Sequence, residues 1–361
     1  MTIRVLTGDC RDVLRTLPAG SAQCCVTSPP YFGLRDYGVA GQIGLEDTPD
    51  AFIAEMVAVF QEVRRVLADD GTLWLNLGDS YAGSWGAQSR EHAGKHAPNI
   101  SALSANQVKA AATRGTMTGS LGRTPGYKAK DLMMIPARVA LALQADGWWL
   151  RSHIIWAKPN PMPESVTDRP TSSHESIFLL SKSARYFYDA GAVRETRTSD
   201  EDANGFRGGA YTGGNIDNGS MGARTARGNK RVGKQEAIAA AAGQAGGSSG
   251  RRMAGFNERW DEAEANGVAA GRNLRNVWTV ASQPFSGAHF ATFPPALIEP
   301  CIKAGSRPGD TVIDPFGGAG TTGLVADRLA RDAILIELNP EYADMARRRV
   351  TDDAPLFAEI A

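Results

Sequence analysis

Apolar residues along the chain follow two spacings, and each spacing predicts one kind of element. Short runs in which apolar residues dominate predict strands, which we expect at residues 3–6, 23–26, 72–77, 148–157, 311–313 and 333–336. Apolar residues at a helical period, bounded by proline, aspartate or glycine, predict helices, which we expect at residues 12–17, 51–67, 131–146, 294–304, 321–330 and 340–350. Strands alternating with helices at these lengths predict an α/β fold, with helices on both faces of one sheet.

The most specific turn in this pattern comes near the end of the chain. Residues 318–323 (GAGTTG) follow one expected strand and open the next expected helix, as a GxGxxG nucleotide-binding turn does. Such turns usually open the first strand–helix–strand unit of a Rossmann-like sheet, yet only 38 residues follow Gly323. The other strands must come from the earlier part of the chain, so we expect a circularly permuted sheet whose nucleotide-binding half comes last.

Composition narrows the class of protein. The 361 residues are 42% hydrophobic and 22% charged, which allows a sizeable core in one large domain or two small ones. There is no run of about 18 apolar residues and no charged-then-apolar leader, so we expect a cytoplasmic protein without a membrane partner. The cysteines lack the spacing of a disulfide framework or a metal site, so we expect buried free thiols and no metal. They are Cys10, Cys24, Cys25 and Cys301.

Charge is balanced overall but is unevenly distributed. The 39 basic and 39 acidic residues give a net charge of zero, yet residues 205–256 hold eight basic and two acidic residues, and residues 83–130 hold seven and one. Both segments are rich in glycine, alanine and serine, which predicts flexible basic loops. Such loops would attract a phosphate backbone, although solvated loops with no partner are the alternative.

The glycine turn has features that favour S-adenosylmethionine as the cofactor. Asp314 precedes the glycines, where a carboxylate could accept from a methionyl ammonium but would repel a pyrophosphate. The turn carries no basic side chain, and Glu337 ends the next strand, where it could accept from ribose hydroxyls. The alternative, based on GxGxxG alone, is a nicotinamide-dependent dehydrogenase.

A second candidate site lies near the start of the chain, where the strand at 23–26 runs into Ser28, Pro29, Pro30 and Tyr31. An exocyclic amine on cytosine or adenine is a poor nucleophile because its lone pair is delocalised into the ring. Two acceptors, the Ser28 hydroxyl and the Pro29 carbonyl, would direct that lone pair outward. Pro30 fixes the loop and Tyr31 offers a ring face to an extruded base. These four residues are the predicted catalytic residues.

With both motifs in this order, the chain resembles the β-class DNA amino-methyltransferases. The resemblance implies a Rossmann-like S-adenosylmethionine-dependent methyltransferase sheet, a catalytic domain of residues 1–190 and 278–361 with 83–130 as a flexible basic insertion, and a target-recognition region at 191–277. It also implies that residues 156–160 lie beside the target base. The implied cofactor-binding residues are Asp9, Phe290, Ala291, Thr292, Asp314, Pro315, Phe316, Gly318, Gly320, Thr321 and Glu337.

The resemblance further implies a double-stranded DNA substrate, base flipping, a possible cognate restriction nuclease, and a monomer or homodimer. On charge alone, we expect DNA contacts from Arg224, Arg227, Lys230, Arg231, Arg251 and Arg252. A Thr-Ser-Pro-Pro-Tyr loop is the family's type mainly for cytosine N4, which is therefore the expected target. Adenine N6 is the nearest alternative, and a non-catalytic DNA-binding protein on the same scaffold is a third.

Overall fold

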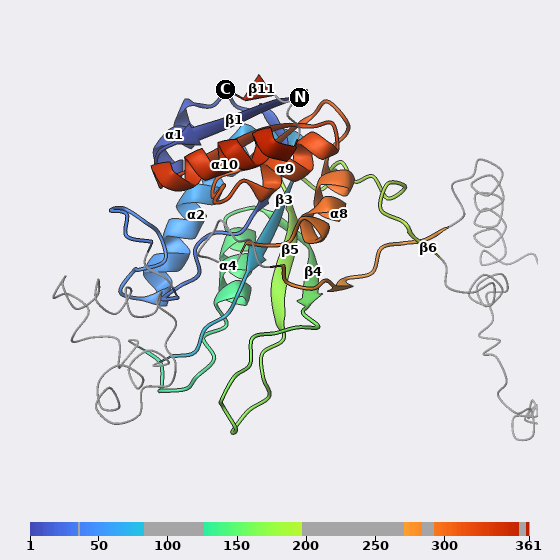
Figure 1. Ribbon diagram of the computed structural model, residues 1–361. Helices are drawn as coiled ribbons and strands as arrows, with labels where there is room; N and C mark the ends of the chain where they lie inside the picture. Colours follow the sequence, from blue (N-terminus) through green and yellow to red (C-terminus); the bar gives the residue numbers. More distant parts are fainter. Residues whose placement is uncertain (35–36, 83–125, 197–270, 284–291, 354–358, 361) are drawn as a thin grey trace, which may run out of the picture. The chain divides into compact units, whose positions relative to one another are not determined.

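The computed structural model describes residues 1–34, 37–82, 126–196, 271–283, 292–353 and 359–360. The chain divides into two compact units. Figure 1 shows the described helices and strands, coloured along the sequence. The first unit comprises Met1–Ala192 and Arg275–Ala361, and the second comprises Val193–Leu274. Among the described residues, no helix is both long and apolar enough to cross a membrane.

The first unit is built on a mixed sheet. Its described strands follow the order β11-β1-β10-β9-β2-β3-β5-β4-β8. Their bounds are Thr2–Thr7 (β1), Ala22–Thr27 (β2), Leu67–Leu77 (β3), Trp149–Ala157 (β4), His174–Ser181 (β5), Val277–Thr279 (β8), Thr311–Asp314 (β9), Asp332–Glu337 (β10) and Glu359–Ile360 (β11). Neighbouring strands from β11 to β3 pair in parallel, whereas β5 runs antiparallel to both β3 and β4.

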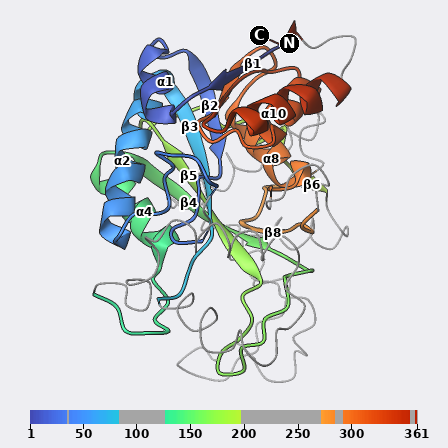
Figure 2. The ribbon, with the colours of Figure 1, turned by 60° about the vertical axis from the view of Figure 1, so that its left-hand side comes forward.

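Two helical layers cover the sheet. Helices α1, α2 and α4 lie on one face, while α8, α9 and α10 lie on the other (Figure 2). Their bounds are Cys10–Thr16 (α1), Pro49–Val66 (α2), Ile135–Ala145 (α4), Pro295–Gly305 (α8), Thr321–Arg328 (α9) and Pro340–Asp353 (α10). The buried side of α2 includes Phe52, Val59 and Phe60, each 0% exposed. The predicted α/β fold with helices on both faces is therefore confirmed.

The centre of the sheet joins the two ends of the chain. Strand β9 pairs with β2 on one side, through Val312 opposite Cys24, and with β10 on the other, through Val312 opposite Ala333. Strands from the end of the chain thus lie between β1 and β2 from its beginning. In open α/β sheets, ligands bind outside the carboxyl ends of the strands, at the point where the strand order reverses and the connections from two neighbouring strands run in opposite directions. A circular permutation stays a prediction, but this strand order brings the two predicted motifs to adjacent strands.

The structure differs from the predicted pattern in several places. Strand β5 was not anticipated, although it pairs along its whole length with β4 and, from Ser176 onward, with β3. The helix expected from residue 131 begins at Ile135, because Leu132 makes a strand bridge to Tyr81 and Met134 adopts a left-handed backbone with φ of 55°. The Asp79 carboxylate then accepts from the backbone N–H of Ile135 at 3.0 Å, which satisfies one donor at the start of α4.

All four cysteines are buried free thiols, as predicted. Cys301 lies inside α8 at 1% exposure, and burial holds the pKa of its thiol well above the usual range. Cys24 and Cys25 lie on β2 at the centre of the sheet and are each 0% exposed. These thiols act as small apolar side chains that fill the core.

The described part of the second unit is a short antiparallel pair. Strands β6 (Glu195–Thr196) and β7 (Gly271–Arg272) form it. The predicted DNA-contacting residues between 224 and 252 lie outside the described residues, as do residues 83–125 of the predicted basic insertion. The assignment of residues 191–277 to target recognition therefore stays a prediction.

Candidate active site

A cavity of about 670 Å³ opens at the carboxyl ends of β2, β9 and β10 in the first unit. One end of it, the Tyr31 end, is lined by Ser28, Tyr31, Asn76, Trp156, Lys158 and Glu175. The other, the glycine-turn end, is lined by Asp9, Asp314, Phe316, Gly318, Glu337 and Tyr342. Two segments that lie almost three hundred positions apart in the sequence thus share one cavity.

The Tyr31 end holds a network of polar side chains centred on Glu175. The Tyr31 hydroxyl donates to Glu175 Oε2 at 2.6 Å, and Asn76 Nδ2 donates to the same carboxylate oxygen at 2.9 Å. The Lys158 ammonium pairs with the other oxygen, Oε1. The ammonium also lies 4.3 Å from the centroid of the Trp156 ring, a cation–π contact. Charge and aromatic surface therefore meet at this end.

Gly78 creates the space for Tyr31. A Cβ added at Gly78 would lie 2.4 Å from Cε2 of the Tyr31 ring, closer than atoms can approach. The missing side chain lets the ring lie against the backbone that follows β3. Burial, and next the nearby Glu175 charge, hold the pKa of the Tyr31 hydroxyl well above its usual range, so the group is a neutral donor.

Asp314 joins the two motifs at the glycine-turn end. Its side chain is 1% exposed, and its Oδ1 accepts from the Thr27 hydroxyl at 2.6 Å and from the Phe316 backbone N–H at 3.0 Å. Its Oδ2 accepts from the Thr322 hydroxyl at 2.6 Å. Burial raises the pKa of Asp314, and these hydrogen bonds partly oppose that effect. Because Thr27 immediately precedes Ser28, the carboxylate links the end of β9 to the start of the Ser-Pro-Pro-Tyr loop.

Glu337 stabilises the glycine turn from the end of β10. One of its oxygens accepts from the Gly318 N–H at 2.8 Å, and the other accepts from the Asn339 N–H at 2.9 Å. Burial is the largest influence on this carboxyl and raises its pKa above the ordinary value of 4.5. A carboxylate oxygen has two lone pairs, so each Glu337 oxygen retains the capacity to accept from a hydroxyl in the cavity.

Asp9 approaches the same end from the start of α1. It caps the helix by accepting from the Arg11 backbone N–H at 2.9 Å, and its carboxylate pairs with the Arg11 guanidinium at 2.5 Å. The hydrogen bond from the Arg11 side chain is the largest cause that holds the pKa of Asp9 below 3.8. Asp9 therefore holds the start of α1 at this end of the cavity, with its charge balanced by Arg11.

The structure brings most of the predicted site residues together. All four residues of the predicted catalytic loop line the cavity. The predicted cofactor residues that line it are Asp9, Thr292, Asp314, Pro315, Phe316, Gly318, Thr321 and Glu337. Phe290 and Ala291 lie outside the described residues. The chemical role of each residue stays a prediction.

Gly320 is the described member of the predicted set that does not line the cavity. A Cβ on it would lie 2.8 Å from the Ala346 Cβ, and its φ of 78° is left-handed. This glycine therefore allows α10 to pack against the turn at the start of α9. Both oxygens of Asp314 already accept hydrogen bonds within the protein, and its expected role toward a methionyl ammonium stays a prediction.

Several cavity residues escaped the sequence-based prediction. Glu175 and Asn76 are the most important of them, and both lie on strands, on β5 and β3 respectively. The apolar run of residues 177–180 was a signal for β5. Nothing local in the sequence indicated that Glu175 would face Tyr31, because that contact depends on antiparallel pairing with β3.

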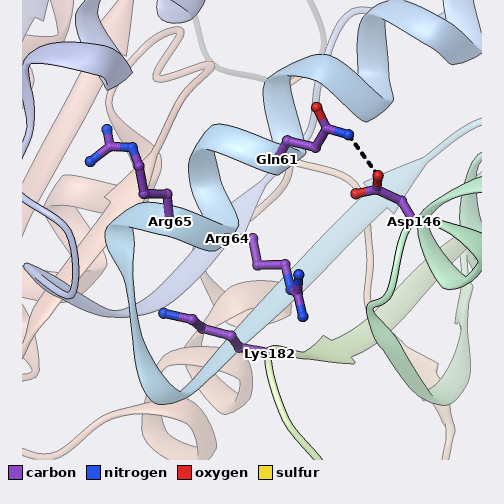
Figure 3. Close-up of a pocket in the computed structure, with 5 residues that line it drawn as sticks. All are labelled: Gln61, Arg64, Arg65, Asp146 and Lys182. Atoms are coloured by element: carbon purple, nitrogen blue, oxygen red, sulfur yellow. Dashed lines mark hydrogen bonds between the residues drawn. The ribbon is translucent and has the colours of Figure 1, made fainter.

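A smaller pocket of about 290 Å³ lies near the other end of β3 (Figure 3). It is lined by Gln61, Arg64, Arg65, Asp146 and Lys182. Gln61 donates to Asp146 at 2.6 Å, as the dashed line in Figure 3 marks. This pocket contains none of the residues predicted to take part in catalysis or cofactor binding.

The family of the chain follows from comparison with known proteins. A family model described as DNA methylase (N6_N4_Mtase) matches residues 22–348. The type II methyltransferase M.Cfr9I of Citrobacter freundii is 43% identical over 98% of this chain and 89% of its own length. The type II methyltransferase M.SmaI of Serratia marcescens is 39% identical over 96% of this chain and 90% of its own length.

Solved structures show the same fold at lower identity. TTHA0409 of Thermus thermophilus, solved in complex with S-adenosyl-L-methionine, superimposes with a TM-score of 0.53 at 22% identity, over 99% of both chains. The cytosine-N4-specific PvuII DNA methyltransferase also gives a TM-score of 0.53, at 16% identity, over 98% of this chain and 92% of its own. The family model and the full-length relatives together establish that the chain belongs to the N6/N4 DNA methylase family.

Proposed function

We propose that this protein transfers a methyl group from S-adenosylmethionine to the exocyclic N4 amine of cytosine in double-stranded DNA. The observation that carries the proposal is the 2.6 Å hydrogen bond from Thr27 to Asp314, which holds the Ser-Pro-Pro-Tyr loop beside the glycine turn in one cavity. In-line transfer requires the amine and the methyl donor to be held next to each other, and two binding motifs that share one cavity can do this. Type II relatives support a partner restriction nuclease with the same target sequence.

The charge of the cavity supports the choice of cofactor. Two of the acidic residues that line it, Asp9 and Glu175, pair with Arg11 and Lys158. The other two, Asp314 and Glu337, have neutral donors as partners, so the described lining keeps an excess of negative charge. S-adenosylmethionine carries a net positive charge from its sulfonium and ammonium groups, whereas a nicotinamide dinucleotide carries a negative pyrophosphate. An acidic cavity attracts the former and repels the latter. When bound, S-adenosylmethionine supplies an electrophilic methyl group.

The chain's own groups would orient the base and hold it away from water. Ser28 and Pro29 line the cavity, and the Ser28 hydroxyl and the Pro29 carbonyl would accept from the N–H bonds of an exocyclic amine. The rings of Tyr31 and Trp156 offer aromatic faces to a base that leaves the DNA stack. No strong base is required before transfer, because the amine becomes acidic only once the methylated nitrogen carries positive charge.

Cytosine N4 is favoured over adenine N6 by the Thr-Ser-Pro-Pro-Tyr form of the loop at residues 27–31. The test is to incubate the protein with DNA and S-adenosylmethionine, digest the DNA to nucleosides, and identify the product by mass spectrometry. N4-methylcytosine is the expected product. N6-methyladenine would reject the base assignment but keep the class of reaction, and no methylated nucleoside from a folded, cofactor-binding protein would favour a non-catalytic DNA-binding role.

Ser28→Ala tests the catalytic loop directly. The variant lacks one of the two acceptors, so we expect its single-turnover rate to fall by about 100-fold. Its affinity for S-adenosylmethionine, measured by calorimetry, should stay unchanged because Asp314 and Glu337 are intact. Retention of a near-normal rate would show that the hydroxyl is not an acceptor for the amine.

A further inference from the structure

Glu175 ends a row of hydrogen-bonding side chains that begins at the proposed catalytic serine. The Ser28 Oγ lies 3.4 Å from the Tyr31 hydroxyl oxygen, a long contact, and that hydroxyl lies 2.6 Å from Glu175 Oε2. Asn76 Nδ2 lies 3.2 Å from the Tyr31 hydroxyl oxygen and 2.9 Å from Glu175 Oε2. The Glu175 side chain is 16% exposed, so little water competes for these bonds.

The number of protons in this row fixes the direction of each bond. A carboxylate can only accept, so the one proton of the Tyr31 hydroxyl is donated to Glu175. The amide nitrogen of Asn76 can only donate, so the Tyr31 oxygen is its acceptor. With its proton committed, the Tyr31 oxygen can meet Ser28 only as an acceptor, and Ser28 must be the donor in their contact. The lone pairs of Ser28 are then left for another partner.

We propose that Glu175 is a positioning residue for methyl transfer: it directs the Tyr31 and Ser28 hydroxyl protons away from the target amine, so that Ser28 faces the amine as an acceptor. This inference rests on the proposed function, because it requires an amine donor at Ser28. It explains how a hydroxyl, which could equally donate, is restricted to accepting. A Ser28 hydroxyl that donated to the amine would compete for the lone pair that must attack the methyl group.

Because of Lys158, only a carboxylate at position 175 can accept from both Lys158 and Tyr31. The ammonium can only donate and pairs with Glu175 Oε1, so that oxygen must remain an acceptor. In a glutamine at position 175, the amide oxygen would turn toward Lys158 and the amide nitrogen toward Tyr31. The Asn76 nitrogen, which now donates to that position, would face another donor and would have to move away. The Tyr31 hydroxyl would then accept from the glutamine nitrogen and donate to Ser28, whose proton would point at the amine. The directions of the two hydroxyls, Tyr31 and Ser28, would be reversed.

Glu175→Gln is the test, with single-turnover methyl transfer to DNA as the measurement. We expect a rate lower by about 10- to 100-fold, with unchanged affinity for S-adenosylmethionine, since the glycine-turn end is intact. Glu62→Gln is the matched control, because Glu62 pairs with Arg65 on α2, outside the cavity, at 2.8 Å. That control should keep its rate within about twofold, because the pair is partly exposed and lies outside the cavity.

A double-mutant cycle separates positioning from a general structural effect. Tyr31→Phe keeps the ring but removes the hydroxyl through which Glu175 acts. Adding Glu175→Gln to Tyr31→Phe should therefore change the rate by no more than about twofold. If the two effects multiply, or if Glu175→Gln alone leaves the rate unchanged, the proposal is overturned.

A second cycle tests the row without touching Glu175, in case Glu175→Gln fails to fold. Tyr31→Phe should have no further effect in a Ser28→Ala background, because no hydroxyl remains to be directed. Multiplying effects would overturn the proposal here too. Failure of the proposed function is distinguishable from these results, since it would leave the unsubstituted protein without methyl transfer to DNA.

Discussion

The two ends of the cavity are each built around a carboxylate, and the two carboxylates have different partners. Asp314 is 1% exposed and accepts from neutral donors, which are two hydroxyls and a backbone amide. Glu175 is 16% exposed and pairs with a charged donor, the Lys158 ammonium, in addition to its hydroxyl and amide donors. The first holds two strands together, while the second orients side chains that face the cavity. Substitutions at the glycine-turn end should therefore alter stability, and those at the Tyr31 end should alter rate.

The largest expected effect is on Asp314. Asp314→Ala leaves the Thr27 and Thr322 hydroxyls and the Phe316 N–H without their acceptor in a buried site. We expect the free energy of unfolding to fall by about 2–4 kcal/mol, since each unsatisfied buried donor costs about 1–3 kcal/mol and hydroxyls can partly reorient. Denaturant unfolding followed by circular dichroism measures it. Methyl transfer should be lost as well.

Asp314→Asn is the matched control at that position. Its amide oxygen still accepts, and one threonine hydroxyl can turn to accept from its amide nitrogen, so the loss of stability should be smaller than for alanine. The substitution also removes the negative charge of the Asp314 carboxyl, a group whose pKa is raised by burial. If Asp314→Ala unfolds at the same denaturant concentration as the unsubstituted protein, the two carboxylates do not differ in the way that we infer.

An intermediate effect is expected from Gly78→Ala at the Tyr31 end. The new Cβ would lie 2.4 Å from the Tyr31 ring, so the ring must move and its hydroxyl must leave Glu175. We expect the single-turnover rate to fall by about tenfold or more, since displacements of about 1 Å can cost up to 100-fold. Cofactor affinity should be nearly unchanged. A loss of affinity equal to the loss of rate would erase the distinction between the two ends.

Much of the fold could be predicted from local pattern, because the central strands are continuous apolar runs and α2 has a clear helical period. The start of α4 could not, since it is set by a left-handed Met134 and by Asp79 from another segment. The glycine turn and the Ser-Pro-Pro-Tyr loop were recognisable because their chemistry is local. Glu175 was not recognisable, because it faces Tyr31 only through the pairing of β5 with β3 and β4.

The smallest expected effect concerns the pH dependence of cofactor binding. Burial raises the pKa of Glu337 above 4.5, so this carboxyl is protonated at a higher pH than an exposed glutamate. As the pH falls through that raised pKa, the loss of charge should weaken S-adenosylmethionine binding by a few-fold, which calorimetry across the acidic range measures. In Glu337→Gln the corresponding step should be absent, and a variant that kept the same step would assign it to another group.

Folding should respond to this group in the opposite direction. The folded protein binds the Glu337 proton more tightly than the unfolded chain does, so the contribution of Glu337 to stability becomes more favourable as the pH falls through the same window. If S-adenosylmethionine binds more weakly at acidic pH, protonation of Glu337 is therefore not weakening it by unfolding the protein. Unfolding of Glu337→Gln at the same pH values is the control.

The position of β9 between β10 and β2 also matters during protein synthesis. The ribosome must complete most of the polypeptide before the strand that belongs beside β2 has been made. Until then the edge of β2 that faces away from β3 has no partner strand. Its pairing must wait for a contact of very long sequence separation. A message cut short before β9 would therefore yield a product that carries the serine loop without its glycine turn, which we expect to be an inactive fragment rather than a slower enzyme.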